Sequence, residues 1–210
     1  MRRWRFNPVL LLGVVPGLAT SCPVLAVPML YGVTGSGGSP SSLYTINPLT
    51  GATTLVGATG TNHVTGIDFD PIIGTLYGVR SDVFGSGETQ LLTLYSGTVA
   101  AAVVGTTSYR IPDITITRNG VLRGWSDTDA TSSFFDNPVE INKATGVTSH
   151  TVSGLDTNGT GVAVLDEANL YVTSRVALYS VNVTTGAKHY YLADLVQTRF
   201  SKICPAAIFS

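Results

Sequence analysis

The sequence predicts an all-β chain folded as a β-propeller, with four blades of four antiparallel strands each. One segment of strand character, Leu30–Val33, recurs as Leu76–Val79, and related segments begin at Leu122 and Leu170. These copies are 46, 46 and 48 residues apart. No stretch combines a 3.6-residue apolar period with helix caps. A period of 40 to 50 residues built from short strands is typical of a propeller blade.

A second family of segments follows each copy and supports the same period. Three of its four members run into a Thr-Gly turn, at Thr50-Gly51, Thr145-Gly146 and Thr185-Gly186, where glycine accepts the left-handed conformation. The four members span residues 43–47, 91–95, 138–142 and 178–182. We therefore expect them to form the third strand of each blade.

The first and fourth strands complete each expected blade. Ile67 and Phe69 alternate with Asp68 and Asp70, as in a strand with two unlike faces. Arg118-Asn119-Gly120 is a hairpin signal. Fourth strands are expected at 53–56, 101–104, 147–152 and 188–192, and the blade repeats begin near residues 30, 66, 113 and 161.

The two ends of the repeat array are offset. The first copy begins at its second strand, whereas residues 202–209 fall one repeat after Gly161–Val164, at a first-strand position. We expect this C-terminal strand to complete the first blade and close a four-bladed ring. The alternative is that the chain is part of a larger ring of six to eight blades.

The N-terminus has the order of a secretory signal peptide over residues 1–26. Arg2, Arg3 and Arg5 precede an apolar run of about 11 residues, too short to span a bilayer, and Val24-Leu25-Ala26 fits a cleavage site. We expect a secreted, periplasmic or cell-surface protein whose propeller domain covers 27–210 and has no later membrane insertion. Lipidation at Cys22 is an alternative.

The charge and the cysteine content of the chain limit the classes of partner that we expect. The chain carries 12 basic and 13 acidic residues, and loss of the leader leaves a net charge of −4. Nucleic acid is therefore not an expected partner. With Cys22 in the leader, Cys204 is a single thiol that forms no internal disulfide. We expect a monomer that binds an unknown protein or carbohydrate.

The segments Leu43–Gly57 and Leu178–Ala187, of the form Leu-Tyr-x-Ile/Val-Asn-x-x-Thr-Gly, carry a resemblance. They resemble the repeats of exported bacterial β-propellers, among them the quinoprotein-like and YVTN-like groups. The resemblance covers most of residues 30–192 and implies the propeller architecture. Its bearing on function is weak, because these groups contain both catalytic and non-catalytic members, and the chain after residue 26 has only Trp125 where quinoprotein-like blades usually each carry a Trp.

Candidate binding residues lie in the connections expected on one face of the ring, where a rigid scaffold presents its variable loops. They are His63, Arg80, Arg110, Trp125, Asp127 and Arg175. The three histidines are not at metal-ligand spacing, no Gly-x-Ser-x-Gly motif occurs, and we expect no metal, no cofactor and no catalytic nucleophile.

Three functions compete at this point. The leading hypothesis is an exported, non-catalytic propeller that binds through loops on one face. The alternative is a propeller enzyme, a lactonase-like hydrolase or a lyase, with Asp68, His63 and Asp113 as acid–base groups at the channel mouth. The third is a truncated fragment of a larger propeller.

Overall fold

The computed structural model describes residues 29–35, 40–81, 89–94, 99–126, 137–155, 159–174 and 177–193. Within these ranges the chain is all-β and forms fifteen strands without a helix. None of the described residues forms a helix long and apolar enough to cross a membrane.

The strands form four antiparallel sheets, each built from consecutive strands. Blade 1 contains β1 (Leu30–Val33), β2 (Ser42–Ile46) and β3 (Thr53–Ala58), and blade 2 contains β4 (Val64–Phe69), β5 (Leu76–Arg80), β6 (Gln90–Leu94) and β7 (Ala101–Thr106). Blade 3 contains β8 (Ile114–Ile116), β9 (Leu122–Ser126), β10 (Asn137–Ile141) and β11 (Thr148–His150), and blade 4 contains β12 (Gly159–Val164), β13 (Asn169–Ser174), β14 (Ala177–Asn182) and β15 (Lys188–Ala193). The order and the repeat confirm the four-bladed β-propeller.

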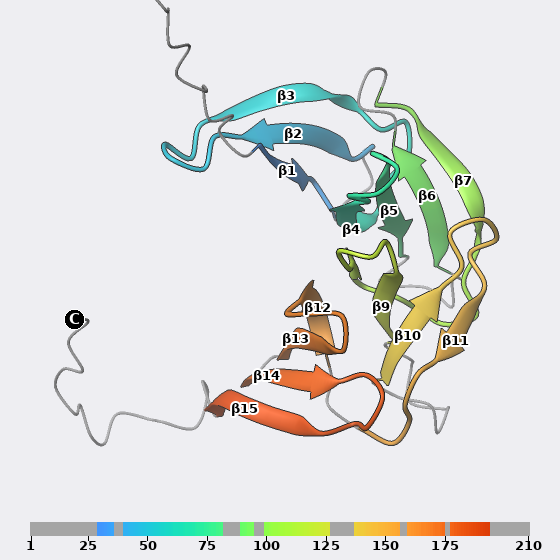
Figure 1. Ribbon diagram of the computed structural model, residues 1–210. Coiled ribbons are helices and arrows are strands. Elements are labelled where there is room, and N and C mark those ends of the chain that lie inside the picture. Colours follow the sequence, from blue (N-terminus) through green and yellow to red (C-terminus); the bar gives the residue numbers. More distant parts are fainter. Residues whose placement is uncertain are drawn as a thin grey trace, which may run out of the picture.

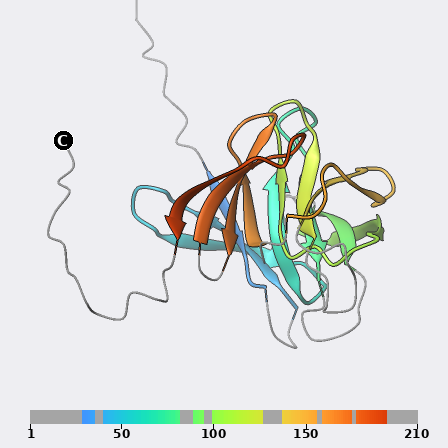
Figure 2. The same cartoon turned by 90° about the horizontal axis from the view of Figure 1, so that it is seen from below.

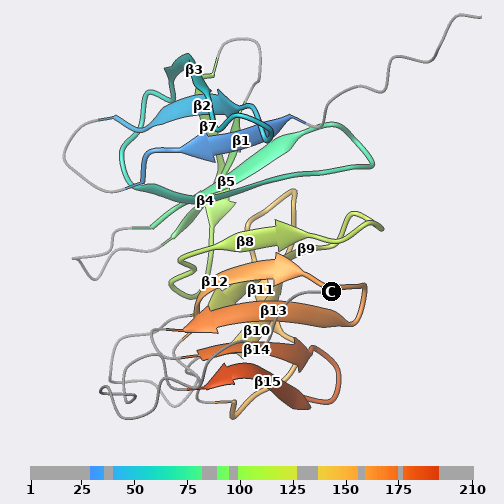
Figure 3. The ribbon, with the colours of Figure 1, turned by 90° about the vertical axis from the view of Figure 1, so that its left-hand side faces the viewer.

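The blades are arranged around an axis with β4, β8 and β12 innermost in blades 2, 3 and 4 (Figure 1). The twisted strands of blade 4 lie side by side in Figure 2. Inner strands join the blades, since β1 contacts β4, β4 contacts β8, and β8 contacts β12. The described part of the ring is open between β1–β3 and β12–β15, and Figure 3 looks into this opening.

Blade 1 has three strands among the described residues, and its β1 occupies the second-strand position, as the repeat predicts. The leader at 1–26, Cys22, Cys204 and the expected closing strand at 202–209 all lie outside the described residues. Closure of blade 1 by the C-terminal strand therefore stays a prediction.

Apolar side chains between neighbouring blades form the core. One cluster between blades 1 and 2 contains Leu43, Leu76 and Leu94, and another between blades 3 and 4 is built around Trp125 and Tyr179. The cluster between blades 2 and 3 contains Val79, Leu122 and Ile141, among others. Each blade is thus held by the faces of its neighbours.

The repeated glycine of the second strand has a packing role. A Cβ at Gly78 would lie 3.2 Å from Leu94 Cδ1, and a Cβ at Gly124 would lie 3.2 Å from Ile141 Cδ1. At Gly32 the corresponding contact is 3.0 Å to Ile46 Cδ1. In three blades the glycine therefore makes room for an aliphatic side chain of the third strand.

Candidate functional site: a cationic rim on a polar anchor

Three of the predicted binding residues lie at the same end of the sheets, on blade 2 and on the connection that leaves it. His63 precedes β4, Arg80 ends β5, and Arg110 lies in the connection from β7 to β8. Because β4 and β5 are antiparallel, with Val64 opposite Arg80, the start of one strand and the end of the other share the same end of the sheet. We call His63, Arg80 and Arg110 the cationic rim.

Thr89 connects these three segments. Its hydroxyl donates to Ser81 Oγ (3.3 Å) and accepts from the Ile111 backbone N–H (2.9 Å). The Ser81 N–H donates to the His63 carbonyl (3.1 Å). Ser81 follows Arg80 and Ile111 follows Arg110, so one buried hydroxyl fixes the backbone beside both arginines.

The same anchor recurs in the neighbouring blades. Ser41 Oγ accepts from the Val64 N–H (3.2 Å), and Asn137 Oδ1 accepts from the Leu155 N–H (3.1 Å). Ser41, Thr89 and Asn137 are buried and are spaced by 48 residues. Each holds the chain where it enters the next blade. Sequence analysis missed these residues, although their regular spacing before the third strand was a usable signal.

The side chains of the cationic rim are partly exposed. Arg80 Nη1 donates to Gln90 Oε1 (3.3 Å), which orients the guanidinium across β5 and β6. His63 has a φ of 58°, a left-handed conformation that is uncommon outside glycine, so its backbone is held by its surroundings. Two guanidinium groups and an imidazole are suited to an anionic ligand.

Trp125 departs from its predicted role. It is fully buried between blades 3 and 4, edge-on to Tyr179 at a centroid distance of 6.4 Å. A Cβ at Gly159 would lie 2.4 Å from Trp125 Nε1, so the indole packs directly on the β12 backbone. The indole of Trp125 therefore belongs to the core between blades 3 and 4 and is not exposed to a ligand, contrary to the prediction. Asp127 and Arg175 lie outside the described residues.

The two carboxylates of the enzymatic alternative lie between blades. Asp68 Oδ2 accepts from the Ile116 N–H (2.6 Å) and from Thr115 Oγ1 (3.0 Å), both in β8. Asp113 Oδ2 accepts from the Val162 N–H of β12 (2.9 Å), while its Oδ1 accepts from the Ile114 N–H (2.9 Å). Each carboxylate thus links its blade to the next one.

Burial raises the pKa of Asp113 to about 6, and the negative charge of Asp68 acts in the same direction, against the two backbone N–H donors. Asp113 also borders a pocket of about 240 Å³ lined by Gly161, Val162, Ala163, Tyr171 and Thr173 of blade 4. Among the described residues no group of three or more His, Cys, Asp or Glu side chains could hold a metal ion.

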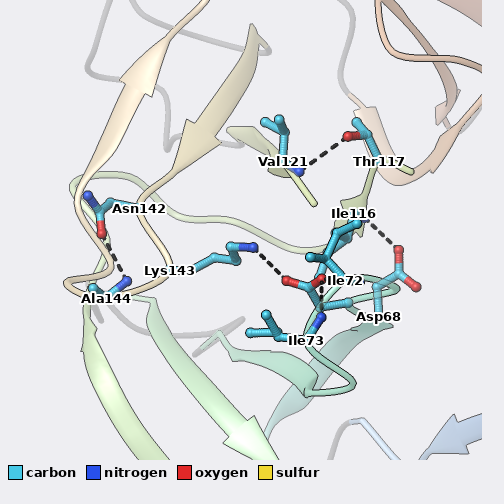
Figure 4. A network of polar contacts seen from close by, with 10 residues as sticks. Asp68, Ile72, Ile73, Ile116, Thr117, Val121, Asn142, Lys143 and Ala144 are labelled. Carbon is cyan, nitrogen blue, oxygen red and sulfur yellow. Dashed lines mark hydrogen bonds and ion pairs between the residues drawn. The ribbon is translucent and has the colours of Figure 1, made fainter. Parts of the chain in front are cut away.

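A second polar link joins blades 2 and 3 at the end of the sheets that lies opposite the cationic rim (Figure 4). Lys143, in the turn between β10 and β11, forms an ion pair with Asp70, which is fully buried in the turn after β4. Asp70 Oδ1 also accepts from the N–H groups of Ile72 (2.8 Å) and Ile73 (3.3 Å). Burial alone would raise the pKa of Asp70, but Lys143 and these donors lower it on balance.

Comparison with known proteins gives the fold and no family. No family model matches the sequence, and no curated protein matches it. Solved β-propeller structures are similar. A chain of the nidogen/laminin complex aligns with a TM-score of 0.58 and 11% identity, over 80% of this chain and 62% of that one.

Two further structures align less closely. TolB from Acinetobacter baumannii gives a TM-score of 0.49 at 13% identity, over 79% of this chain and 41% of that one. A gluconolactonase from Xanthomonas campestris gives 0.43 at 16% identity, over 65% and 42%. The chain thus spans less than two thirds of the length of each of the three structures.

Proposed function

We propose that the protein is an exported, non-catalytic binding module that takes an anionic carbohydrate at the cationic rim. The hydrogen bonds through which the buried Thr89 hydroxyl and Ser81 tie together the segments of His63, Arg80 and Arg110 carry this proposal. Positive groups held on a fixed backbone recognise carboxylates at a lower entropic cost than groups on mobile segments. An acidic sugar also offers hydroxyl groups to Gln90 and to the rim backbone.

The hydrogen bonds of two carboxylates argue for binding rather than catalysis. Asp68 and Asp113 are the carboxylates that the enzymatic alternative needs, and backbone N–H groups occupy both oxygens of each, one from the following residue and one from a strand of the next blade. A general base must reach the proton of a substrate. Carboxylates already engaged in linking blades are better suited to holding the propeller together.

Calorimetric titration with oligogalacturonate, and with neutral galactose oligomers of the same length, tests this function. We expect the acidic sugar to bind and the neutral one to bind at least about tenfold more weakly. The double variant Arg80→Ala/Arg110→Ala should lose the acidic sugar. The control variant is Arg118→Ala. Arg118 is an exposed arginine in the β8–β9 turn of blade 3, at the end of the sheets opposite the cationic rim.

Two results would count against the proposal. The first is equal binding of neutral and acidic sugars, and the second is an equal loss of binding in Arg118→Ala and in the double variant.

The raised pKa of Asp113 favours acid–base chemistry as a second candidate function. Lactone hydrolysis by the wild type that disappears in Asp113→Asn, at unchanged folding, would establish it instead.

A further inference from the structure

One arginine of the cationic rim is paired with a neutral amide across two strands. Arg80, at the end of β5, lies directly opposite Gln90, at the start of β6. Opposite residues of an antiparallel pair have Cβ atoms about 5 Å apart and present their side chains on the same face. Arg80 Nη1 donates to Gln90 Oε1 at 3.3 Å, so the two side chains also contact each other.

Buried hydroxyl groups fix the backbone next to this pair on both strands. Ser81 follows Arg80 and Thr89 precedes Gln90, and the Thr89 hydroxyl donates to Ser81 Oγ (3.3 Å). Both hydroxyl side chains are buried, whereas Arg80 and Gln90 are partly exposed. The pair is therefore held in register at its base, and its polar ends can reach a ligand at a low entropic cost.

The hydrogen bond decides which polar groups of the pair remain for a ligand. A guanidinium group has donors only, so Gln90 turns its amide oxygen to Arg80 and keeps its NH₂ group, with two donors, for another partner. Among the described residues, no acceptor is bonded to this NH₂ group and no carboxylate forms an ion pair with Arg80. The pair thus offers donors beside a positive charge, which a glutamate at position 90 would neutralise.

We infer, on the basis of the function proposed above, that Gln90 makes the cationic rim specific for a carboxylate with a second acceptor oxygen beside it. The carboxylate accepts from the Arg80 guanidinium, and the neighbouring oxygen accepts from the Gln90 NH₂ group. A uronic acid has this arrangement, because its ring oxygen is bound to the carbon that carries the carboxylate. An ammonium group, which only donates, would meet a like charge at Arg80.

Calorimetric titration of Gln90→Glu with oligogalacturonate tests the role of the amide. The new side chain has nearly the same shape, but its carboxylate pairs with Arg80 and repels the carboxylate of the sugar. We expect binding at least about tenfold weaker than in the wild type, with a melting temperature equal to or above that of the wild type. If Gln90 only held Arg80 in place, the variant would bind as well as the wild type, because a carboxylate holds a guanidinium at least as firmly as an amide does. Unchanged or tighter binding would therefore overturn the inference.

Two further variants complete the test. Asn47→Asp makes the same exchange of amide for carboxylate at an exposed position of the β2–β3 turn, at the end of the sheets opposite the cationic rim. Asn47 Oδ1 accepts from the N–H groups of Leu49 and Thr50, which a carboxylate can also do, so this control should bind as the wild type does. Gln90→Met removes the amide without adding a charge and should weaken binding about three- to tenfold. Full binding in Gln90→Met would contradict a contact between the amide and the sugar.

Failure of this inference can be told apart from failure of the proposed function. If Arg80→Ala/Arg110→Ala loses the acidic sugar while Gln90→Glu binds it as the wild type does, the protein binds the sugar and the role given to Gln90 is wrong. If the wild type does not bind the acidic sugar, both are wrong. Circular dichroism should show all variants folded, so that a loss of binding reports on the pair and not on the blade.

Discussion

The carboxylate of Asp68 in β4 accepts a hydrogen bond from the backbone N–H of Ile116 in β8, one repeat later in the chain. Thr115 in β8 repeats this relationship, because its Oγ1 accepts from the Val164 N–H in β12 (3.2 Å). Side chains of one inner strand thus satisfy the backbone of the next. The four sheets are separate, so these hydrogen bonds between inner strands join neighbouring blades near the axis.

Replacing Asp68 by alanine should destabilise the protein. The variant leaves the buried Ile116 N–H and the Thr115 hydroxyl without their acceptor, and an unsatisfied buried donor costs about 1–3 kcal/mol. Urea unfolding of Asp68→Ala measures the loss. Glu140→Ala, which removes an exposed carboxylate from β10, should stay within about 0.5 kcal/mol of the wild type. Equal effects of the two substitutions would contradict the role of Asp68.

Asp113 should make stability depend on pH between about 4 and 7. Folding raises its pKa from 3.8 to about 6, so its favourable contribution is complete below pH 3.8 and is lost as the pH rises through 6. The change amounts to at most about 3 kcal/mol. Unfolding free energies measured across this range should fall more steeply with pH in the wild type than in Asp113→Asn. Parallel curves would show that Asp113 ionises as it does in the unfolded chain.

Lys143→Met should destabilise the junction of blades 2 and 3. It leaves the buried Asp70 carboxylate without its charged partner, which costs about 3 kcal/mol, at the low end for buried pairs because Lys143 is 29% exposed. The lowered pKa of Asp70 stabilises the fold above pH 3.8 and this contribution is lost in acid. Thermal unfolding should show that Asp70→Asn recovers part of the loss in the Lys143→Met background, and no recovery would argue against the ion pair.

The repeated glycines should differ in their tolerance of alanine. At Gly124 a Cβ would lie 2.7 Å from Ile111 Cγ2 in a packed core, so Gly124→Ala should cost about 1–3 kcal/mol. At Gly32 the neighbour is Ile46 Cδ1, the end of a half-buried side chain that can move. The cost there should be under about 1 kcal/mol. Chemical denaturation of the two variants checks this order, and the reverse order would contradict the packing assigned to Gly124.

The sequence predicted the architecture because the repeat is local and regular. The second and third strands were found from Leu-Tyr-Gly-Val and its partner segment, and the structure extends the fourth strands to Ala58, Thr106 and Ala193 while shortening the third blade's to Thr148–His150. Strand ends depend on bulges, such as the one between Leu91 and Leu92 that shifts β7, and these have no pattern in the sequence.

The site was only partly predictable. His63 and Arg110 lie in connections and Arg80 ends β5, and the structure places all three at the same end of the sheets. Trp125 was predicted to bind a ligand, but it is part of the core. An aromatic residue near the end of a strand gives the same sequence pattern whether its side chain faces a loop or the next blade. Asp68 contacts β8 one repeat later in the chain, and Thr89 contacts the segment that leads into blade 3. Neither contact leaves a mark on local composition.

Amide hydrogen exchange tests most directly the claim that the buried side chains of Ser41, Thr89 and Asn137 fix the chain where it enters the next blade and so hold the cationic rim in place. The amides of Val64, Ile111 and Leu155, bound by Ser41, Thr89 and Asn137, should exchange slowly, and Ile111 alone should accelerate in Thr89→Val. If these three amides exchange as fast as that of the exposed Leu49 turn in the wild type, the side chains do not hold the blades, and the account is wrong.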